Sequence, residues 1–195
     1  MRNRHWKQLD EGHLLLVVAA FDERTAMDAL TAITTRRSVR RFTDAPLSDE
    51  QLEIVLRAAM AAPSASNGRS WRFVVVRDRD RLQRLAHATP FAGPVAEAAA
   101  CIVVCADRLT LKYPGFWVID CSAAIENLLL AAHATGLGAV WLGVHPIAPF
   151  RSAVRRIIEA PPTVVVHSMI AIGVPVAVPA PVDRYDTSFV HAERW

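Results

Sequence analysis

The clearest strand signal in this chain is Trp71-Arg72-Phe73-Val74-Val75-Val76, which is nearly continuous in apolar character, as central strands of a sheet are. A helix precedes it, because Ser48 and Gln51 have the spacing of a capping box and an apolar helical pattern then runs up to Pro63. The residues between helix and strand, Pro63–Ser70, are small and polar. The sequence therefore predicts a helix, a tight polar loop and a central strand in succession.

Helical and strand-like segments alternate outward from this unit. The further helices are expected at Met27–Thr34, Arg79–Ala88, Val95–Ala99, Cys121–Thr135 and Phe150–Glu159. The further strands are expected at Ala100–Cys105, Ala139–Val144 and Thr163–Ile172. Such alternation predicts a sheet that is covered by helices on both faces.

The end of the chain has a different character. Val174–Val182 is rich in proline and has no periodicity, so we expect it to be extended. The final residues carry Tyr185, Phe189 and Trp195, and a merely disordered tail seldom holds so many aromatic side chains. We therefore expect this tail to lie on protein, on its own chain or on a partner subunit.

Composition limits the classes of protein to consider. With 195 residues, 52% of them apolar and 21% charged, the chain is long enough for one globular domain. The mean hydropathy of +0.22 is high, yet no apolar run is long enough to cross a bilayer, so we interpret the surplus as an oligomer interface. A net charge of +3, concentrated at Arg36–Arg41 and Arg151–Arg156, is small for a nucleic-acid binder. We expect no nucleic-acid or membrane partner.

The cysteines and histidines suggest no metal or nucleophilic chemistry. Cys101, Cys105 and Cys121 are too few for a disulfide framework, and free buried thiols in a reducing cytoplasm explain them better than a metal site does. His133 and His167 fall in apolar segments, where satisfied core histidines are expected. No GxGxxG or phosphate-binding Walker loop occurs either.

A cluster of cations follows the first helical pattern. Arg36-Arg37-Ser38-Val39-Arg40-Arg41-Phe42 crowds four guanidinium groups around one hydroxyl. Guanidinium donors match phosphate oxygens, and so many like charges repel one another unless an anion lies among them. The cluster indicates a phosphate-bearing ligand. The alternative is a solvated basic turn.

The first 26 residues are considered separately. Basic residues precede the apolar run Leu14–Phe21, but Asp10 and Glu11 interrupt them and no cleavage site of small residues follows clearly. We expect residues 1–26 to be an accessory extension or the product of an upstream start, and residues 27–195 to form the functional domain with its extended tail.

Four segments in order carry a resemblance to a known family. They are Arg36–Phe42, Pro63–Trp71, Gly136-Leu137-Gly138 through Trp141-Leu142-Gly143, and Asp183-Arg184-Tyr185. In this order and spacing the chain resembles the flavin-dependent nitroreductase family from about Met27 to Trp195. The resemblance implies an α+β fold, a three-layer α/β/α nitroreductase-like domain with a mixed central sheet, and a homodimer with FMN bound between the subunits.

The arginine cluster has defined roles under this resemblance. Arg36 would grip the FMN phosphate, and Ser38 would bond the phosphate or the ribityl chain. Arg40 would reach the pyrimidine edge of the flavin, where a cation stabilises the negative charge of the reduced ring. Arg37 is also included among the cofactor-binding residues, although it and Arg41 would point away if alternate side chains point into the site.

The remaining segments complete the implied cofactor site. Its residues would be Pro63, Ser64, Ala65 and Asn67 from the small-residue loop, Leu142 and Gly143 near flavin N5, and Arg184 at the phosphate. The loop departs from the commoner pattern at Arg69 and Ser70, and Arg69 could face either the substrate mouth or solvent. On the residues alone, Gly143 could also be an ordinary strand-end glycine, and Arg184 a solvated tail charge.

The implied function is that of an FMN-dependent oxidoreductase. NADH or NADPH would give a hydride to the flavin, and a nitroaromatic, a quinone or a similar small acceptor would then take the electrons. The flavin carries the chemistry, so no catalytic side chain and no metal are assigned. Alternatives are a flavin-binding module without turnover, another flavin chemistry of the family such as dehalogenation, dehydrogenation or flavin breakdown, or a basic anion-binding domain. The physiological substrate, the preferred nicotinamide and the role of His145 stay open.

Overall fold

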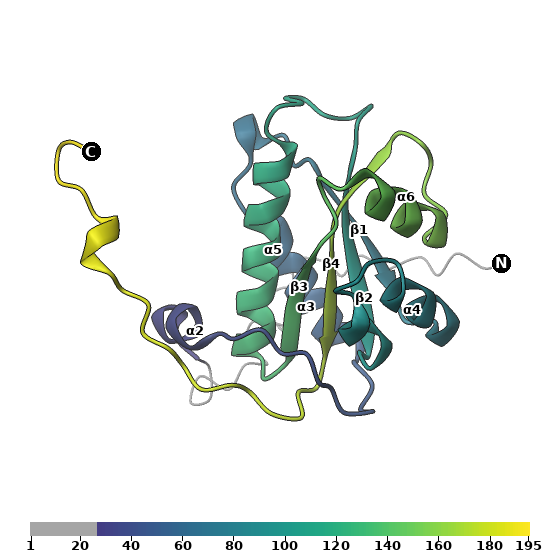
Figure 1. Ribbon diagram of the computed structural model, residues 1–195, viewed down its shortest axis with the longest axis horizontal. Helices are drawn as coiled ribbons and strands as arrows, with labels where there is room; N and C mark the ends of the chain where they lie inside the picture. Colours follow the sequence, from purple (N-terminus) through teal and green to yellow (C-terminus); the bar gives the residue numbers. More distant parts are fainter. Residues whose placement is uncertain (1–26) are drawn as a thin grey trace, which may run out of the picture.

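Figure 1 shows a sheet held between helices, with the C-terminal tail leading away from it. This is a computed structural model, and it describes residues 27–195; the expectation of an accessory extension over residues 1–26 lies outside the described residues. The helices are α2 (Ala29–Thr35), α3 (Asp49–Met60), α4 (Arg79–Ala86), α5 (Trp117–Ala134) and α6 (Ala148–Ile157). The strands are β1 (Trp71–Val76), β2 (Ala100–Asp107), β3 (Gly138–Gly143) and β4 (Val164–Gly173). Short 3-10 turns occur at η1 (Ala65–Asn67), η2 (Gly93–Ala96) and η3 (Thr187–Phe189).

The sheet has the order β1-β2-β4-β3, and every neighbouring pair in it is antiparallel. The prediction of a mixed sheet is therefore wrong for residues 27–195, where the sheet is wholly antiparallel. The reason lies in the connections: the α4 excursion returns the chain to the end of the sheet that it left, so Val76 pairs with Cys101. The connection through α6 does the same between β3 and β4. Helix–strand alternation alone does not distinguish this course from a parallel crossover.

The predicted segment Trp71–Val76 is confirmed as a strand, but it forms the edge of the sheet rather than its centre. Its near-continuous apolar character has another cause. Trp71, Phe73 and Val75 belong to the core beneath α3 and α5, whereas Val74 and Val76 belong to the core beneath α4 and α6. A strand that helices cover on both faces is apolar at most positions whether or not it has neighbours on both sides, and only Arg72 interrupts the run here.

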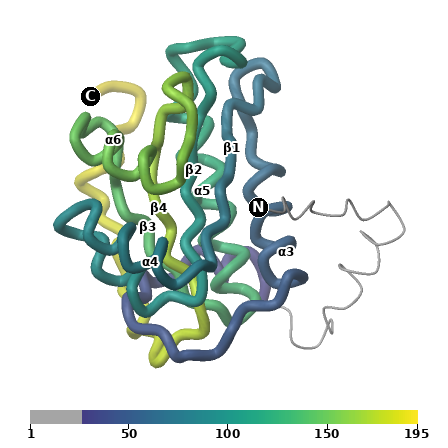
Figure 2. Tube along the Cα trace, turned by 90° about the vertical axis from the view of Figure 1, so that its right-hand side faces the viewer, coloured from purple at the N-terminus to yellow at the C-terminus, as the bar shows by residue number. Residues whose placement is uncertain are grey.

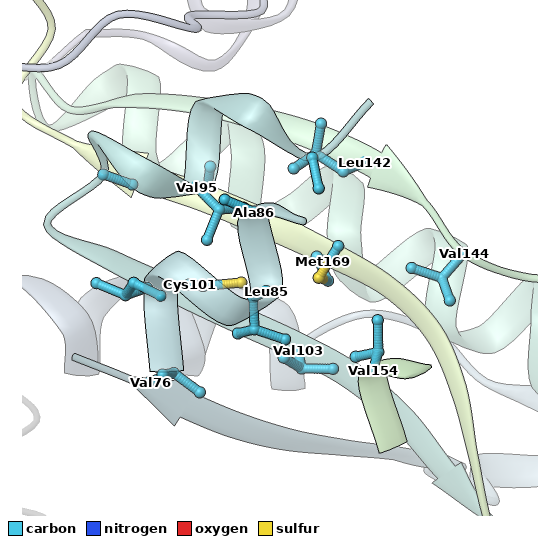
Figure 3. Close-up of a cluster of buried hydrophobic side chains, with 14 of the residues drawn as sticks. Val76, Leu85, Ala86, Val95, Cys101, Val103, Leu142, Val144, Val154 and Met169 are labelled. Atoms are coloured by element: carbon cyan, nitrogen blue, oxygen red, sulfur yellow. The ribbon is translucent and has the colours of Figure 1, made fainter. Parts of the chain in front are cut away.

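Two cores hold the three layers together, as predicted. One packs α3 and α5 against one face of the sheet, with Leu52, Ile125 and Leu128 fully buried. Figure 3 shows the other core, beneath α4 and α6, where Leu85, Val103 and Met169 meet. Burying a large aliphatic side chain stabilises the fold by about 1.5–3 kcal/mol. Figure 2 shows α3 on the side of the sheet away from α4 and α6.

The predicted starts of α3 and α4 are confirmed in detail. The helix expected over Val95–Ala99 is instead the 3-10 turn η2, and α5 begins one turn before the expected Cys121. Ser48 Oγ accepts a hydrogen bond from the Gln51 N–H (3.1 Å), and Gln51 Oε1 accepts one from the Ser48 N–H (2.9 Å). Asp78 caps α4 through the Arg81 N–H (2.9 Å). Because α3 ends at Met60, the small-residue loop begins at a fixed point.

The arginine segment, residues 36–42, runs from α2 past the start of β3. The Val39 N–H donates to the Ala139 carbonyl (3.0 Å), and the Thr43 N–H donates to the Val174 carbonyl (2.9 Å). Gly138 permits this approach, since a Cβ there would lie 2.7 Å from Cγ1 of Val39. The segment is thus anchored to the sheet and to the start of the tail.

The tail is extended from Val174 to Val182, as predicted, and it carries only the short turn η3 beyond. Figure 1 shows it passing α2 and leading away from the domain. Tyr185, Phe189 and Trp195 are exposed in the single chain. The expectation that the tail lies on a partner subunit stays a prediction.

Candidate functional site

Arg36 is a half-buried cation of the arginine segment. Its Nε lies 3.2 Å from Oε1 of Glu126 on α5, and its side chain is 24% exposed. This ion pair lacks hydrogen-bond geometry, so the buried Nε of Arg36 has no hydrogen-bond partner within residues 27–195. Close by, Thr35 Oγ1 lies 2.8 Å from Nε2 of His133. Burial, and then the charges of Arg36 and Arg37, hold the pKa of His133 below its ordinary value.

Arg37 connects the arginine segment to the tail. Its Nε donates to the Ala180 carbonyl (3.1 Å) and its Nη2 donates to the Val182 carbonyl (3.0 Å). The second of these bonds fixes the tail at Val182, which stands two residues before Arg184. The structure thus brings the late arginine to the neighbourhood of the early cluster.

The other members of the segment diverge. Arg41 turns to Glu97, with Nε 2.8 Å from Oε2. Arg40 is exposed and forms no side-chain hydrogen bond in the described part of the chain, and Ser38 is half-buried. Arg36 and Arg41 therefore have carboxylate partners in different parts of the fold, and the guanidinium of Arg40 stays open to a ligand.

The small-residue loop, residues 63–70, is held by one buried carboxylate. Asp120, in the first turn of α5, accepts hydrogen bonds from the Ala65 N–H (3.0 Å) and the Ser70 hydroxyl (2.6 Å). Ser66 and Asn67 have positive φ angles of 45° and 54°, which non-glycine residues seldom adopt. A strained backbone of this kind persists only where surrounding contacts fix it, so the loop has a defined conformation.

Asp120 was not among the residues selected from the sequence. A signal was present, because an acidic residue in the first turn of an otherwise apolar helix needs a polar partner once it is buried. Asn67 and Pro63 are exposed on the loop, while Ser64 and Ala65 are half-buried. Arg69 is also exposed, and it lines a pocket of about 830 Å³ between α3 and the edge of β1.

Leu142 and Gly143 end β3 in different environments. The Leu142 side chain is buried in the core beneath α4 and α6 (Figure 3), so only its main chain can meet a ligand. Gly143 is exposed, and a Cβ there would meet no atom of the described chain within 4 Å. Packing within the described chain therefore does not require glycine at this position.

A β-bulge beside this strand end places two histidines together. Ser168 pairs with Val104 and Val166 pairs with Cys105, which leaves His167 as the extra residue. His167 is buried, and its Nδ1 lies 2.8 Å from Ser168 Oγ. The His145 ring stacks over it at 6.3 Å between centroids. His167 is thus a satisfied core histidine, as predicted.

Both histidines of this pair stay neutral near pH 7. Burial, and then the neighbouring His145, lower the pKa of His167 to about 4. Burial, and then the charge of Arg151, lower the pKa of His145. Trp117 packs edge-on against His145 at 4.9 Å. A largely aromatic, uncharged wall therefore borders the end of β3.

Helix α5 separates the two halves of the predicted site within one chain. Asp120 holds the small-residue loop, whereas Glu126 and His133, farther along the same helix, contact Arg36 and Thr35. A rise of 1.5 Å per residue puts about 9 Å between the levels of Asp120 and Glu126. Within one chain, the arginine segment contacts the tail. The loop that carries Asn67 contacts α5 at a different height along the helix axis.

The three cysteines are free and buried, as predicted. Burial raises the pKa of each of Cys101, Cys105 and Cys121 to about 12. Among the described residues, no three His, Cys, Asp or Glu side chains gather in a way that could hold a metal ion. Across residues 27–195, no helix has both the length and the apolar character needed to cross a bilayer.

Comparison with known proteins gives consistent matches. A sequence model described as "Nitroreductase family" matches residues 33–117 and 92–174. A protein of Methanothermobacter thermautotrophicus, named for the candidate activities NADH dehydrogenase and NAD(P)H nitroreductase, is 41% identical over 183 residues. That match covers 94% of this chain and 96% of the relative.

Two solved structures share the fold. One, from Parabacteroides distasonis, has the same pair of candidate activities, a TM-score of 0.82 and 38% identity, over 86% of this chain and 98% of that chain. The other is a candidate nitroreductase from Desulfovibrio desulfuricans solved in complex with FMN, with a TM-score of 0.76 and 33% identity, over 88% of this chain and 99% of that chain. With these matches over most of its length, and with the antiparallel sheet and arginine segment described above, this chain belongs to the nitroreductase family.

Proposed function

We propose that this chain is an FMN-dependent oxidoreductase that passes a hydride from NADH or NADPH to a small acceptor such as a nitroaromatic or a quinone. Residues 27–195 are its FMN-binding domain. The observation that carries the proposal is the geometry of the arginine segment. Arg36 is half-buried there, and Arg37 binds the tail at Val182, two residues before Arg184. Family membership supports the same assignment, since one relative in this fold was solved with FMN.

The residues of the arginine segment fit a phosphate dianion. The buried Nε of Arg36 forms no hydrogen bond of suitable geometry among residues 27–195, although Oε1 of Glu126 lies 3.2 Å away, and Arg40 is open to solvent. Ser38 adds a hydroxyl donor, and Arg184 follows the tail carbonyls that Arg37 binds. Charge-assisted hydrogen bonds from such a set are short and strong. We assign Arg36, Ser38 and Arg184 to the phosphate end of FMN.

The residues near the end of β3 suit the ring of FMN. When bound, FMN supplies a ring that accepts a hydride and gives the electrons to a second molecule. Arg40 provides a cation for the negative charge that reduction creates, and Gly143 leaves its main chain open to close approach. The neutral His145–His167 pair and Trp117 exclude water on this side.

We propose that a second copy of the chain completes the site. The small-residue loop, with Pro63, Ser64, Ala65 and Asn67, lies about 9 Å along α5 from the level of Arg36, so the loop of a partner is better suited to meet a cofactor held there. Exposed apolar side chains on α2, Leu30 and Ile33, support an interface between copies.

The tail supports a homodimer in the same way. It exposes apolar residues along its length, and among residues 27–195 β1 forms an edge of the sheet beside the 830 Å³ pocket. An exposed sheet edge accepts an added extended segment. We assign that pocket to the tail of the second copy. The free, buried thiols suit a reducing compartment, and we propose a cytoplasmic location on that basis.

A visible spectrum of freshly purified protein, followed by anaerobic titration with NADH and with NADPH, tests the function. We expect flavin absorbance that at least one nicotinamide bleaches and that a quinone or nitroaromatic restores. Flavin that neither nicotinamide reduces would instead support a binding module. A protein that stays colourless after incubation with FMN refutes the proposal.

A further inference from the structure

A second, smaller pocket lies between α6 and the start of β4, and three arginines line it. It measures about 160 Å³, with Arg151 and Arg155 of α6 on one side and Arg108, just after β2, on another. Val164 and Val166 also line it. We call it the arginine pocket. Its volume is far below the roughly 300–1,000 Å³ of pockets that enclose drug-sized ligands, so it suits one charged group of a molecule that lies mostly outside.

Two of its cations converge on a single oxygen. Arg108 Nη2 donates to the Pro162 carbonyl (3.1 Å), and Arg155 Nη1 donates to the same oxygen (3.2 Å). These bonds brace the turn before β4, but a neutral carbonyl does not balance two positive charges. Each guanidinium has five N–H donors, so most of the donors of this pair remain available.

Arg151 stands at a helix position that is electrostatically unfavourable for a cation. It stands in the first turn of α6, where the helix dipole disfavours a cation. Its Nε is buried and has no hydrogen-bond partner within residues 27–195. A buried donor without an acceptor destabilises a fold, and an anionic ligand in the pocket would remove that penalty.

The charge balance around the pocket differs from that of a nearby arginine. Arg81 of α4 pairs with Glu159, which follows α6, at 2.9 Å. Within the described chain, Arg108, Arg151 and Arg155 have no carboxylate oxygen within 4 Å. The acidic neighbour of Arg108, Asp107, instead accepts the Leu109 N–H (3.1 Å).

We infer that the arginine pocket binds a phosphate group, at a site separate from the arginine segment. Guanidinium forks match phosphate oxygens, and three of them around a small pocket provide both charge and directed donors. The phosphate has two sources: a bound nicotinamide dinucleotide or the free anion. The location favours the dinucleotide, because α6 begins five residues after Gly143 and β3 ends at the end of the sheet where β4 begins. This choice of source rests on the proposed function; the phosphate site itself does not.

Thermal unfolding of the FMN-loaded protein tests the site. At constant ionic strength set with chloride, we expect inorganic pyrophosphate to raise the melting temperature in a saturable way. The double variant R151Q/R155Q should lose most of that shift. R156Q, which removes a neighbouring α6 arginine that does not line the pocket, should keep it. If the double variant does not fold, R108Q replaces it, because Arg108 lies in an exposed loop. An equal shift in wild type and in the pocket variants overturns the inference.

Kinetics with both nicotinamides identify the source. If a dinucleotide phosphate occupies the pocket, R151Q should raise KM about tenfold or more with little change in kcat, for NADPH alone if the 2′-phosphate binds there and for both donors if the pyrophosphate does. If R151Q leaves both KM values unchanged while R151Q/R155Q loses the rise in melting temperature with pyrophosphate, the site binds the free anion. Loss of FMN from R151Q/R155Q would mean that the pocket holds the cofactor phosphate, which overturns a separate site. If neither nicotinamide reduces the wild-type flavin, the proposed function fails, and the pyrophosphate result still judges the pocket.

Discussion

The guanidinium of Arg36 lies against the carboxylate of Glu126, with Nε 3.2 Å from Oε1. This contact ties the arginine segment to the middle of α5 and leaves Arg36 partly neutralised. A phosphate that binds Arg36 therefore competes with Glu126 for the same cation. Variants at Arg36 and Glu126 therefore test the site most directly.

Replacing Arg36 by alanine should release FMN. The change removes a charge-assisted contact worth about 2–3 kcal/mol, which corresponds to about 30- to 150-fold weaker binding. Flavin fluorescence during dialysis measures the loss. R41A is the matched control, since Arg41 pairs with Glu97 instead. Holoprotein that survives dialysis equally well in both variants would contradict the role of Arg36.

Replacing Glu126 by glutamine should have the opposite effect. It removes the anion that competes for Arg36, and a partly exposed ion pair is worth about 0.2–1 kcal/mol. We expect FMN to bind about 1.4- to fivefold more tightly, as measured by fluorescence titration of apoprotein. Weaker binding in E126Q would indicate that Glu126 positions Arg36 rather than competing with the ligand.

Replacing Asp120 by asparagine should loosen the small-residue loop. The amide offers one acceptor oxygen where the carboxylate accepts from both Ala65 and Ser70, so a buried polar group loses its partner. We expect a loss of about 1–3 kcal/mol in the free energy of unfolding in urea. D44N, a change at an exposed position, serves as the control. The prediction is wrong if the two variants unfold at the same urea concentration.

His167 should make the stability fall in mild acid. Its pKa is lowered to about 4 in the folded chain from an ordinary 6.5, so below pH 6.5 the unfolded state takes up a proton that the folded state refuses. The stability associated with this residue is complete above pH 6.5 and is lost progressively as the pH falls towards 4. Urea unfolding of wild type and H167Q from pH 7.5 to 4 measures the difference. Parallel stability curves for the two proteins would refute the assignment.

Gly138 should tolerate no side chain. A Cβ there would lie 2.7 Å from Val39 Cγ1 and 3.0 Å from Pro175 Cβ, so G138A must displace either the arginine segment or the tail. We expect the free energy of unfolding to fall by about 1–3 kcal/mol. The control is G115A, because a Cβ at Gly115 meets nothing within 4 Å. Equal stability of the two variants would show that the segment does not pack against β3 as described.

Local sequence signals predicted the elements well. The capping box at Ser48 and Gln51 and the strand Trp71–Val76 appear where the sequence placed them. These signals act between residues a few positions apart, so they can be interpreted without knowing the rest of the fold. The burial of the three cysteines is confirmed for a similar reason, since each lies in a run of apolar residues.

The arrangement of the elements was harder to predict. The mixed sheet and the central position of Trp71–Val76 were wrong, because an apolar strand shows that both of its faces are covered but not which strands lie beside it. The carboxylate anchor Asp120 and the bulge at His167 were also missed. Both depend on partners far away in the chain, and no local period reports such contacts.

The sequence by itself determined the approximate positions of the four strands and of most helices, and which donors can meet an anion. Periodicity, caps and guanidinium chemistry are properties of single residues and near neighbours. Only the tertiary structure decided that Arg36 faces Glu126, that Arg37 holds the tail and that Arg108 approaches Arg155. These relations arise when the antiparallel sheet and its two helical layers close around the apolar cores, which brings charges from distant segments to fixed positions.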